Sequence, residues 1–276
     1  ILHEINDQMD IIKPITKWQT RVMDAKNIPA AVQESFLQLR TGRPRPVEIE
    51  IPPEVLSEVA DSPNYLRARI PRAAINQKSV KNGAAIITSS KNPVIWAGGG
   101  VHLSEASNEL LALAEYLQIP ILTTPEGKGS ISDQHYLSIG TPQGRSTGNS
   151  KDPLRDFFYT RDVILAVGTR FAYADPKPYQ QVVQIDIDPK EIGRNHKKTL
   201  SILGDARQVL SQLLEAIKTK TKPKQNQKIT FDKMRSNRYE NPANQVEPLA
   251  SYVKALRRGM PDDAILVTDM TTIAYY

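Results

Sequence analysis

Hydrophobic positions in the first fifty residues follow two different spacings. Between 28 and 40, apolar residues recur every three or four positions, which places them on one face of a helix. The segment VEIEI, 47–51, instead alternates apolar and polar residues, as a half-buried strand does. The pattern therefore predicts a helix over 28–40 that leads into a strand at 47–51.

Short apolar runs alternate with segments of helical periodicity between about 79 and 220. The predicted strands are 94–97, 119–123, 163–167 and 182–187, and the predicted helices are 104–117 and 205–218. Strands that are apolar on both faces are typical of a parallel sheet covered by helices. The predicted fold class is α/β, with a complete layered domain whose parallel sheet is flanked by helices.

Two segments without regular periodicity separate this block from the rest of the chain. Residues 52–72 contain four prolines, and TKTKPKQNQK, 219–228, is strongly basic. A helical pattern at 246–258 and the apolar run AILVTD, 264–269, predict another helix and another buried strand. The expected organisation is a partial α/β domain at 1–54, a linker at 55–78, the complete domain at 79–222, a linker at 223–244, and the beginning of a further α/β domain at 245–276.

Composition narrows the classes of function. Hydrophobic residues make up 39% of the 276 residues, enough to bury a core in one or two domains. No run approaches the roughly 18 apolar residues of a membrane span, and no leader pattern opens the chain, so we expect a cytoplasmic protein without a membrane partner. The absence of cysteine excludes disulfides, thiolate metal sites and cysteine nucleophiles.

Charge and histidine placement exclude further classes. The 36 basic residues exceed the 30 acidic ones, but the excess is concentrated at 219–228, where like charges favour a solvated, extended linker. We therefore expect no nucleic-acid partner. The four histidines lie far apart in the sequence and have no matching serine or carboxylate pattern, which argues against Ser-His-Asp chemistry and against zinc.

The first strand of the predicted sheet runs directly into three glycines. In parallel sheets, ligands bind at the carboxyl ends of the strands, where loops and helix N-termini present free N–H groups. Gly98, Gly99 and Gly100 could bring backbone amides close to a phosphate, or they could form only a tight turn. Ser104 is the expected cap of the next helix, with Glu105 in its first turn.

The other apolar runs also end in small or polar residues. They continue into TTPEGKG (123–129), GTRF (168–171), DID (186–188) and GDA (204–206). Asp186 could accept hydrogen bonds from a ribose, or it could mark an ordinary strand exit before the Asp188-Pro189 turn. Arg170 could contact a phosphate or a flavin, or form a surface ion pair. The DxD pair has no further ligand nearby, so we predict no metal site there.

Seven segments in one order resemble the acetolactate synthase-like family of thiamine-diphosphate-dependent enzymes. They are GRPRPVEIEIP (42–52), NPVIWAGGGV (92–101), IPILTTPEGKG (119–129), LAVGTRF (165–171), VVQIDIDPKEIG (182–193), GDA (204–206) and ILVTD (265–269). The resemblance implies that 1–54 is the last part of a pyrimidine-binding domain. It implies a central FAD- or nucleotide-binding-like domain at 79–222 and the start of a diphosphate-binding domain at 245–276.

The resemblance also implies an activity and an assembly. It implies decarboxylation of a 2-oxo acid at thiamine diphosphate, followed by carboligation, in a homodimer or homotetramer that uses Mg²⁺. Alternatives are a flavin-free decarboxylase or lyase of the same superfamily and a non-catalytic nucleotide-binding module. The family's catalytic glutamate and its magnesium motif would lie outside residues 1–276. We therefore expect a piece of a longer protein, without catalytic or metal residues of its own and inactive alone.

Cofactor contacts follow from the same resemblance. Thr271 and Thr272 fall where relatives contact the diphosphate of thiamine diphosphate. Positions that match FAD contacts are Arg43, Gly98, Gly99, Gly100, Thr124, Gly140, Gly168, Thr169, Arg170, Asp186, Ile187, Asp205 and Ala206. The sequence departs from the synthase pattern after GTRF, where Ala172, Tyr173 and Ala174 replace acidic residues and an arginine, and this departure favours the flavin-free alternative.

Overall fold

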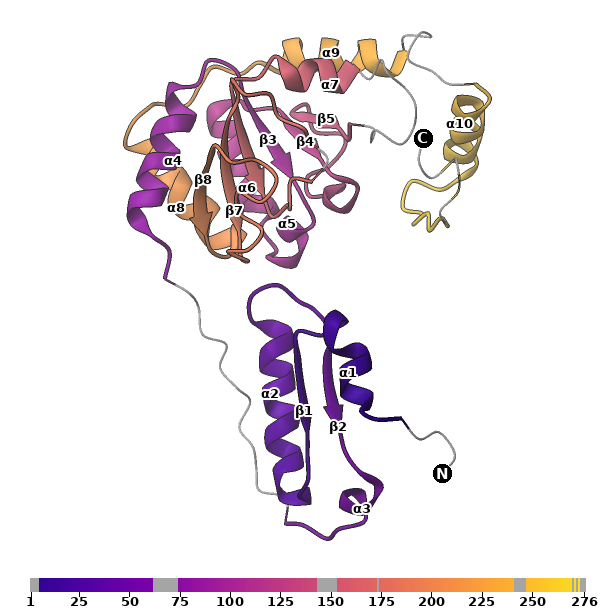
Figure 1. Ribbon diagram of the computed structural model, residues 1–276. Helices are drawn as coiled ribbons and strands as arrows, with labels where there is room; N and C mark the ends of the chain where they lie inside the picture. The colour runs from indigo at the N-terminus through magenta and orange to yellow at the C-terminus, as the bar shows by residue number, and fades with distance from the viewer. Residues whose placement is uncertain are drawn as a thin grey trace. The chain divides into compact units, whose positions relative to one another are not determined.

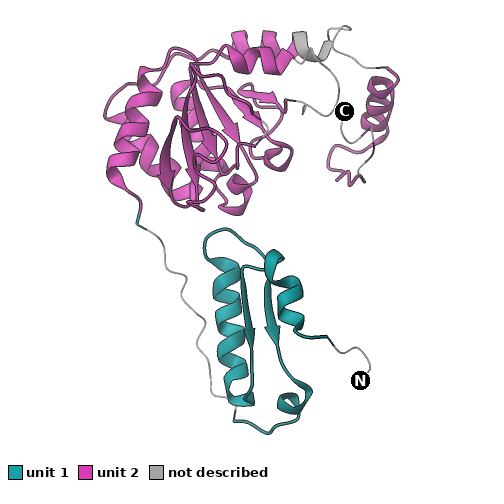
Figure 2. Ribbon diagram, in the orientation of Figure 1, with its two compact units in different colours: residues 1–74 teal, residues 75–276 magenta. Residues whose placement is uncertain are grey.

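The computed structural model describes residues 5–61, 74–142, 153–172, 174–240, 247–269, 271 and 273, with 237–240 described by their backbone alone. The chain divides into two compact units, 1–74 and 75–276 (Figure 2). Within the described residues, no helix combines the length and the apolar character needed to cross a membrane.

The first unit contains a parallel βαβ arrangement. Strand β1 (Trp18–Arg21) pairs with β2 (Val47–Glu50), and helix α2 (Ile28–Arg40) connects them. The smaller elements are α1 (Gln8–Ile12), η1 (Lys13–Ile15), η2 (Ala25–Asn27) and α3 (Pro53–Leu56). The predicted helix at 28–40 and the strand that follows it are confirmed, whereas β1 was not predicted.

A six-stranded parallel sheet organises the second unit (Figure 1). Its strands are β3 (Pro93–Ala97), β4 (Ile121–Thr123), β5 (Ser138–Gly140), β6 (Val163–Val167), β7 (Gln181–Asp186) and β8 (Thr199–Leu203), in the order β5-β4-β3-β6-β7-β8. The chain moves outward from β3 to β5 and then returns to β6 on the other side of β3. The strand order therefore reverses between β3 and β6, and all carboxyl ends lie along one edge.

Helices cover both faces of this sheet. On one face, α4 (Gln77–Ser89), α6 (Ser107–Leu117) and α8 (Ala206–Lys218) pack side by side, and Gly83 of α4 lies against Val183. On the other face, Phe158 of α7 (Pro153–Tyr159) packs on Trp96 with ring centroids 4.9 Å apart. The strand register aligns Trp96 with Gln184, so these two side chains lie on the same face of the sheet. Val183, the residue before Gln184, points to the opposite face, because successive residues of a strand alternate between faces. The predicted α/β layered fold is confirmed.

The predicted cap at Ser104 is wrong. A short helix, α5 (Gly100–Leu103), forms directly after β3, and Ser104 is the residue that ends it. Glu105 then adopts a positive φ of 52°, and α6 begins at Ser107 without a side-chain cap. The helix begins early because the N–H groups of Leu103 and Ser104 bond back to the carbonyls of Gly99 and Gly100.

The predicted strand at 264–269 is also absent from the structure. Ile265 and Val267 are 89% and 87% exposed, and no strand among the described residues pairs with this segment. An apolar run becomes a strand only when a neighbouring strand completes its backbone hydrogen bonds. The helix predicted just before it is present as α10 (Leu249–Gly259).

The segment that follows α8 packs against the rest of the second unit. The N–H of Lys224 donates to the Tyr116 carbonyl at 2.9 Å, and the Tyr116 hydroxyl donates to the Thr221 carbonyl at 2.8 Å. Helix α9 (Lys228–Glu240) follows, with Phe231 only 6% exposed. The basic segment, which we predicted to be an extended linker, is therefore held at the end of α6 by hydrogen bonds between its backbone and Tyr116.

Candidate functional site

The parallel sheet gathers most of the predicted contact residues at one edge. They follow or end the strands in this order: Gly98, Gly99 and Gly100 after β3, Thr124 after β4, Gly140 in β5, Gly168, Thr169 and Arg170 after β6, Asp186 and Ile187 at the end of β7, and Asp205 and Ala206 after β8. This carboxyl edge includes the reversal between β3 and β6. Open α/β sheets form a crevice for ligands at such a reversal.

Glycine is required at the reversal because two backbones approach each other closely. The N–H of Gly98 donates to the Val167 carbonyl and the N–H of Gly100 to the Gly168 carbonyl, each at 2.9 Å. A Cβ on Gly100 would lie 2.5 Å from the Cα of Gly168, and a Cβ on Gly98 would lie 2.5 Å from the carbonyl oxygen of Gly168. The glycines thus form a tight turn, and two of their three amides already have backbone partners.

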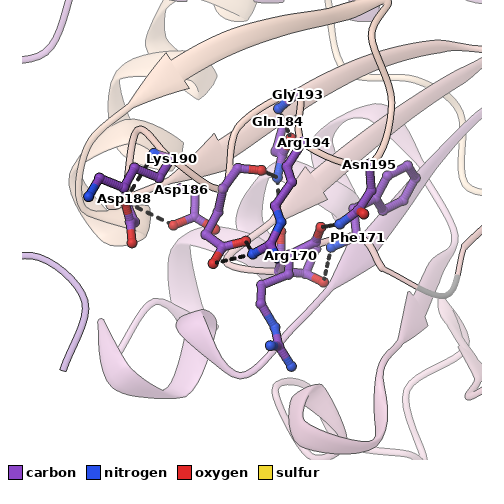
Figure 3. A network of polar contacts seen from close by, with 11 residues as sticks. Arg170, Phe171, Gln184, Asp186, Asp188, Lys190, Gly193, Arg194 and Asn195 are labelled. Carbon is purple, nitrogen blue, oxygen red and sulfur yellow. Dashed lines mark hydrogen bonds and ion pairs between the residues drawn. The ribbon is translucent and has the colours of Figure 1, made fainter. Parts of the chain in front are cut away.

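Other donors at the reversal have no partner. The N–H groups of Gly99 and Thr169 make no hydrogen bond within the described residues. The exposed Arg170 guanidinium likewise forms no hydrogen bond or ion pair in that part of the chain, and Figure 3 shows it pointing away from the neighbouring polar network. Two backbone donors and a cation suit an anionic group such as a phosphate.

The loop after β4 is closed onto β3. The N–H of Thr124 donates to the Ala97 carbonyl at 2.9 Å, and the Thr124 hydroxyl oxygen accepts the N–H of Gly127 at 3.0 Å. A Cβ on Gly127 would lie 2.2 Å from the Ala97 carbonyl oxygen, so this loop also depends on glycine. The Thr124 hydroxyl keeps a proton that it can still donate.

At the end of β7, Asp186 helps to build the turn. Its carboxylate accepts the N–H of Asp188 at 2.9 Å, and the Asp188 carboxylate accepts the N–H of Lys190 at 3.0 Å. Asp186 is 5% exposed, whereas Ile187 is 41% exposed. The strand-exit role of both aspartates is therefore present in the structure.

The sequence analysis missed a buried polar network beside Arg170 (Figure 3). Gln184, 2% exposed, donates to the carbonyls of Thr169 at 3.0 Å and Glu191 at 3.3 Å and accepts the N–H of Gly193 at 3.0 Å. Arg194 pairs with the buried Glu191 carboxylate at 3.2 Å. A glutamine inside the otherwise apolar run VVQI was the signal that could have revealed this network.

The remaining predicted residues have other surroundings. Asp205 caps α8 by accepting the N–H of Gln208 at 3.1 Å, and Gly140 has a φ of 118° in the edge strand β5. Arg43 belongs to the other compact unit, 1–74. Thr271 is exposed, and its N–H donates to the Asp269 carbonyl at 2.8 Å. Thr272 lies outside the described residues.

A metal site is not formed by the part of the chain that the structure describes. No group of three or more histidines and carboxylates in those residues lies close enough together to hold an ion. The amide, hydroxyl and guanidinium donors described above could bind an anionic ligand at this edge.

Comparison with known proteins identifies the family. Residues 80–213 match the family model of the thiamine pyrophosphate enzyme central domain. A protein described as "Probable acetolactate synthase large subunit" from Methanocaldococcus jannaschii is 35% identical over 224 residues, which cover 76% of this chain and 37% of that protein. The acetolactate synthase large subunit of Corynebacterium glutamicum is 34% identical over 229 residues, covering 77% of this chain and 35% of that subunit.

A solved structure shows the same fold. Benzoylformate decarboxylase from Polynucleobacter necessarius superposes with a TM-score of 0.69 at 19% identity, covering 93% of this chain and 48% of that one. The chain thus spans less than half the length of these relatives. It belongs to the thiamine pyrophosphate-dependent enzymes and carries their central domain.

Proposed function

We propose that the whole protein is a thiamine-diphosphate-dependent carboligase that decarboxylates a 2-oxo acid and joins the product to an acceptor, as an acetolactate synthase does. The observation that carries this proposal is the 34–35% identity to acetolactate synthase large subunits over three quarters of the chain. Thiamine diphosphate supplies the electron sink for decarboxylation when it is bound.

We also propose that the carboxyl edge of the central sheet binds FAD. The amides of Gly99 and Thr169 have no hydrogen-bond partner among the described residues and lie at the strand reversal, as does Arg170, and these donors fit a diphosphate. Gly98 and Gly100 contribute close backbone packing instead of amide donors. We assign Asp186 and Thr124 to the remainder of the dinucleotide.

The same assignment includes proposals for residues away from this edge. Thr271 and Thr272 would contact the diphosphate of thiamine diphosphate, and Arg43 would contact the flavin nucleotide. Mg²⁺ would be a further cofactor, held by residues outside 1–276. A homodimer or homotetramer, a cytoplasmic location and the domain limits given above complete the proposal.

The direct test measures flavin and activity in the full-length protein. Wild-type protein should retain FAD and release CO₂ from pyruvate only when thiamine diphosphate and Mg²⁺ are present. Arg170→Ala should lower FAD affinity about tenfold, because a charged contact to a phosphate is lost. Lys91→Ala removes an exposed cation at the opposite edge of the sheet and should leave FAD affinity unchanged. Wild-type protein that neither binds FAD nor uses pyruvate would refute both proposals.

A flavin-free decarboxylase is the second candidate. It is favoured by the occupied amides of Gly98 and Gly100 and by Ala172 and Ala174 at positions where synthases carry charged side chains. Release of an aldehyde from a 2-oxo acid by protein that contains no flavin would support this candidate over the carboligase.

A further inference from the structure

Gln184 lies where the two loops of the carboxyl edge meet. It is a buried amide on β7, on the face of the sheet that also carries Trp96. Its amide nitrogen donates to the Thr169 carbonyl in the loop after β6 and to the Glu191 carbonyl in the loop after β7. Its oxygen accepts the N–H of Gly193. One side chain therefore connects residues 168–171 to residues 188–195.

A second contact joins the same two loops at their exposed side. The Asn195 side chain donates to the Arg170 carbonyl at 2.8 Å (Figure 3). Within the first loop, the N–H of Phe171 donates to the Thr169 hydroxyl oxygen at 3.1 Å. The backbone on both sides of Arg170 is thus fixed through its neighbours, although the guanidinium itself is not.

We propose that Gln184 is a positioning residue that holds these two loops in one arrangement and so directs the Thr169 amide and the Arg170 guanidinium toward the phosphates of a bound dinucleotide. The proposal rests on the nucleotide site proposed above. It assigns Gln184 no contact with the ligand, since its polar atoms are already engaged by backbone groups.

The residue just before the same strand provides a matched control. Gln180, adjacent to the first residue of β7, is 1% exposed and also forms three hydrogen bonds to the backbone. Its amide nitrogen donates to the carbonyls of Phe158 at 2.8 Å and Arg161 at 2.9 Å, and its oxygen accepts the N–H of Lys177 at 2.8 Å. The Gln180 side chain forms these hydrogen bonds at the amino end of β7, away from the carboxyl edge.

Two substitutions separate positioning from general stability. Gln184→Met and Gln180→Met each keep the side-chain size and remove three hydrogen bonds from a buried position, so both should lower the melting temperature by similar amounts. Only Gln184→Met should release the carboxyl-edge loops. Asn195→Ala removes the exposed tie between the loops without disturbing the core and decides the question if Gln184→Met fails to fold.

The experiment combines hydrogen exchange of the 276-residue chain without ligand and titration of the same chain with FAD. In Gln184→Met, the amides of Phe171 and Glu191 should exchange faster. The FAD affinity should fall about tenfold, which corresponds to the net contribution of about one hydrogen bond. Asn195→Ala should change both quantities in the same direction by a smaller factor. Gln180→Met should leave exchange at Phe171 and Glu191 and the FAD affinity as they are in the wild type.

Two results would overturn the inference. Unchanged exchange of both loops in Gln184→Met and Asn195→Ala would show that the loops are not coupled. Equal loss of FAD affinity in Gln180→Met would show that the effect is one of stability alone. Failure of the wild-type chain to bind FAD would instead refute the proposed nucleotide site, and the exchange of Phe171 and Glu191 would still decide whether Gln184 couples the loops.

Discussion

Single glycines determine how closely the loops after β3, β4 and β6 approach one another. Gly100 and Gly168 are in backbone contact, and Gly127 lies against Ala97 in the same way. A side chain at any of these positions would push the loops apart, because backbone atoms cannot rotate away as a flexible side chain can. The glycine run after Trp96 is therefore explained by packing before any ligand is considered.

Replacement of Gly100 tests this explanation. Gly100→Ala should lower the free energy of unfolding by about 1–3 kcal/mol, the usual cost of overpacking a well-packed site. Gly259→Ala is the matched control, because a Cβ at Gly259 meets nothing within 4 Å. Urea denaturation of both variants measures the difference. Equal stability of the two alanine variants would contradict the packing explanation.

Asp162 is a residue whose ionisation contributes to stability. Burial acts to raise the pKa of its carboxyl, but hydrogen bonds from the Ser90 hydroxyl and from the N–H groups of Lys91 at 2.8 Å and Asn92 at 3.0 Å outweigh burial and hold the pKa below its ordinary value. A carboxyl with a lower pKa in the folded state stabilises the fold above its unfolded pKa of about 3.9. That contribution is lost as the pH falls through the folded value.

The pH dependence of an Asp162→Asn variant follows from this sign. At pH 7 the variant should be about 2 kcal/mol less stable than the wild type, because charge-assisted hydrogen bonds are lost. The difference should shrink below about pH 4, because Asp162 is protonated first in the unfolded chain and then, at lower pH, in the folded protein. Asp156→Asn, at an exposed position, should show neither effect. Thermal unfolding across this pH range checks the prediction, and a difference that grows on acidification would contradict it.

Elements with strong periodicity could be predicted from the sequence, and elements defined by their neighbours could not. The helix at 28–40 and the strand at 163–167 were predicted within one residue, the helix because its apolar positions follow the helical period and the strand because all five residues are apolar. Strand β1 has the sequence WQTR and is only partly buried, and β5 has three residues. Both are strands because a neighbouring strand pairs with them, and this pairing cannot be predicted from the local sequence.

The candidate site was predictable in position but not in detail. Parallel strands place their carboxyl ends at one edge, so residues such as Gly98 and Arg170 could be assigned to the same site from the sequence alone. Gln184 bonds to Thr169, 15 residues earlier in the sequence, and this contact exists only after β6 and β7 have paired. No local pattern could show which amides would be occupied.

Helix α2 in the first unit is fixed at its C-terminus by a lysine from another element. The Lys17 ammonium donates to the carbonyls of Gln38 at 2.7 Å and Thr41 at 2.5 Å. Carbonyls at a helix C-terminus have no intrahelical partner, and a cation there interacts favourably with the helix dipole. Lys17 therefore orders the turn that leads to Arg43.

Lys17→Met should test the role of this contact. The variant should lose about 1–2 kcal/mol of stability, since at least one charge-assisted hydrogen bond to the helix end disappears. Lys13→Met is the control, because the Lys13 side chain is 72% exposed and its contact with Asp10 is a surface ion pair. Hydrogen exchange at the C-terminal turn of α2 should be faster in Lys17→Met alone, and identical exchange in the two variants would rule out the contact's role.

At the scale of the whole molecule, the described residues contain a two-stranded parallel sheet in the first unit and a six-stranded parallel sheet in the second. The family match at 80–213 coincides with the six-stranded sheet, whereas the relatives extend well beyond the chain. The proposed cofactor contacts follow the same division. The nucleotide contacts are concentrated on the sheet, and the thiamine diphosphate contacts are assigned to Thr271 and Thr272 near the end of the sequence.

The most direct test of the account is hydrogen exchange of the 276-residue chain with and without FAD. The account predicts slower exchange at 98–101 and 168–171 when FAD is present, because these loops would contact its diphosphate. Exchange in the turn at 90–93, at the amino edge of the same sheet, should stay the same. Unchanged exchange at both loops under saturating FAD, or protection confined to the amino edge, would contradict the claim that the carboxyl edge is a dinucleotide site.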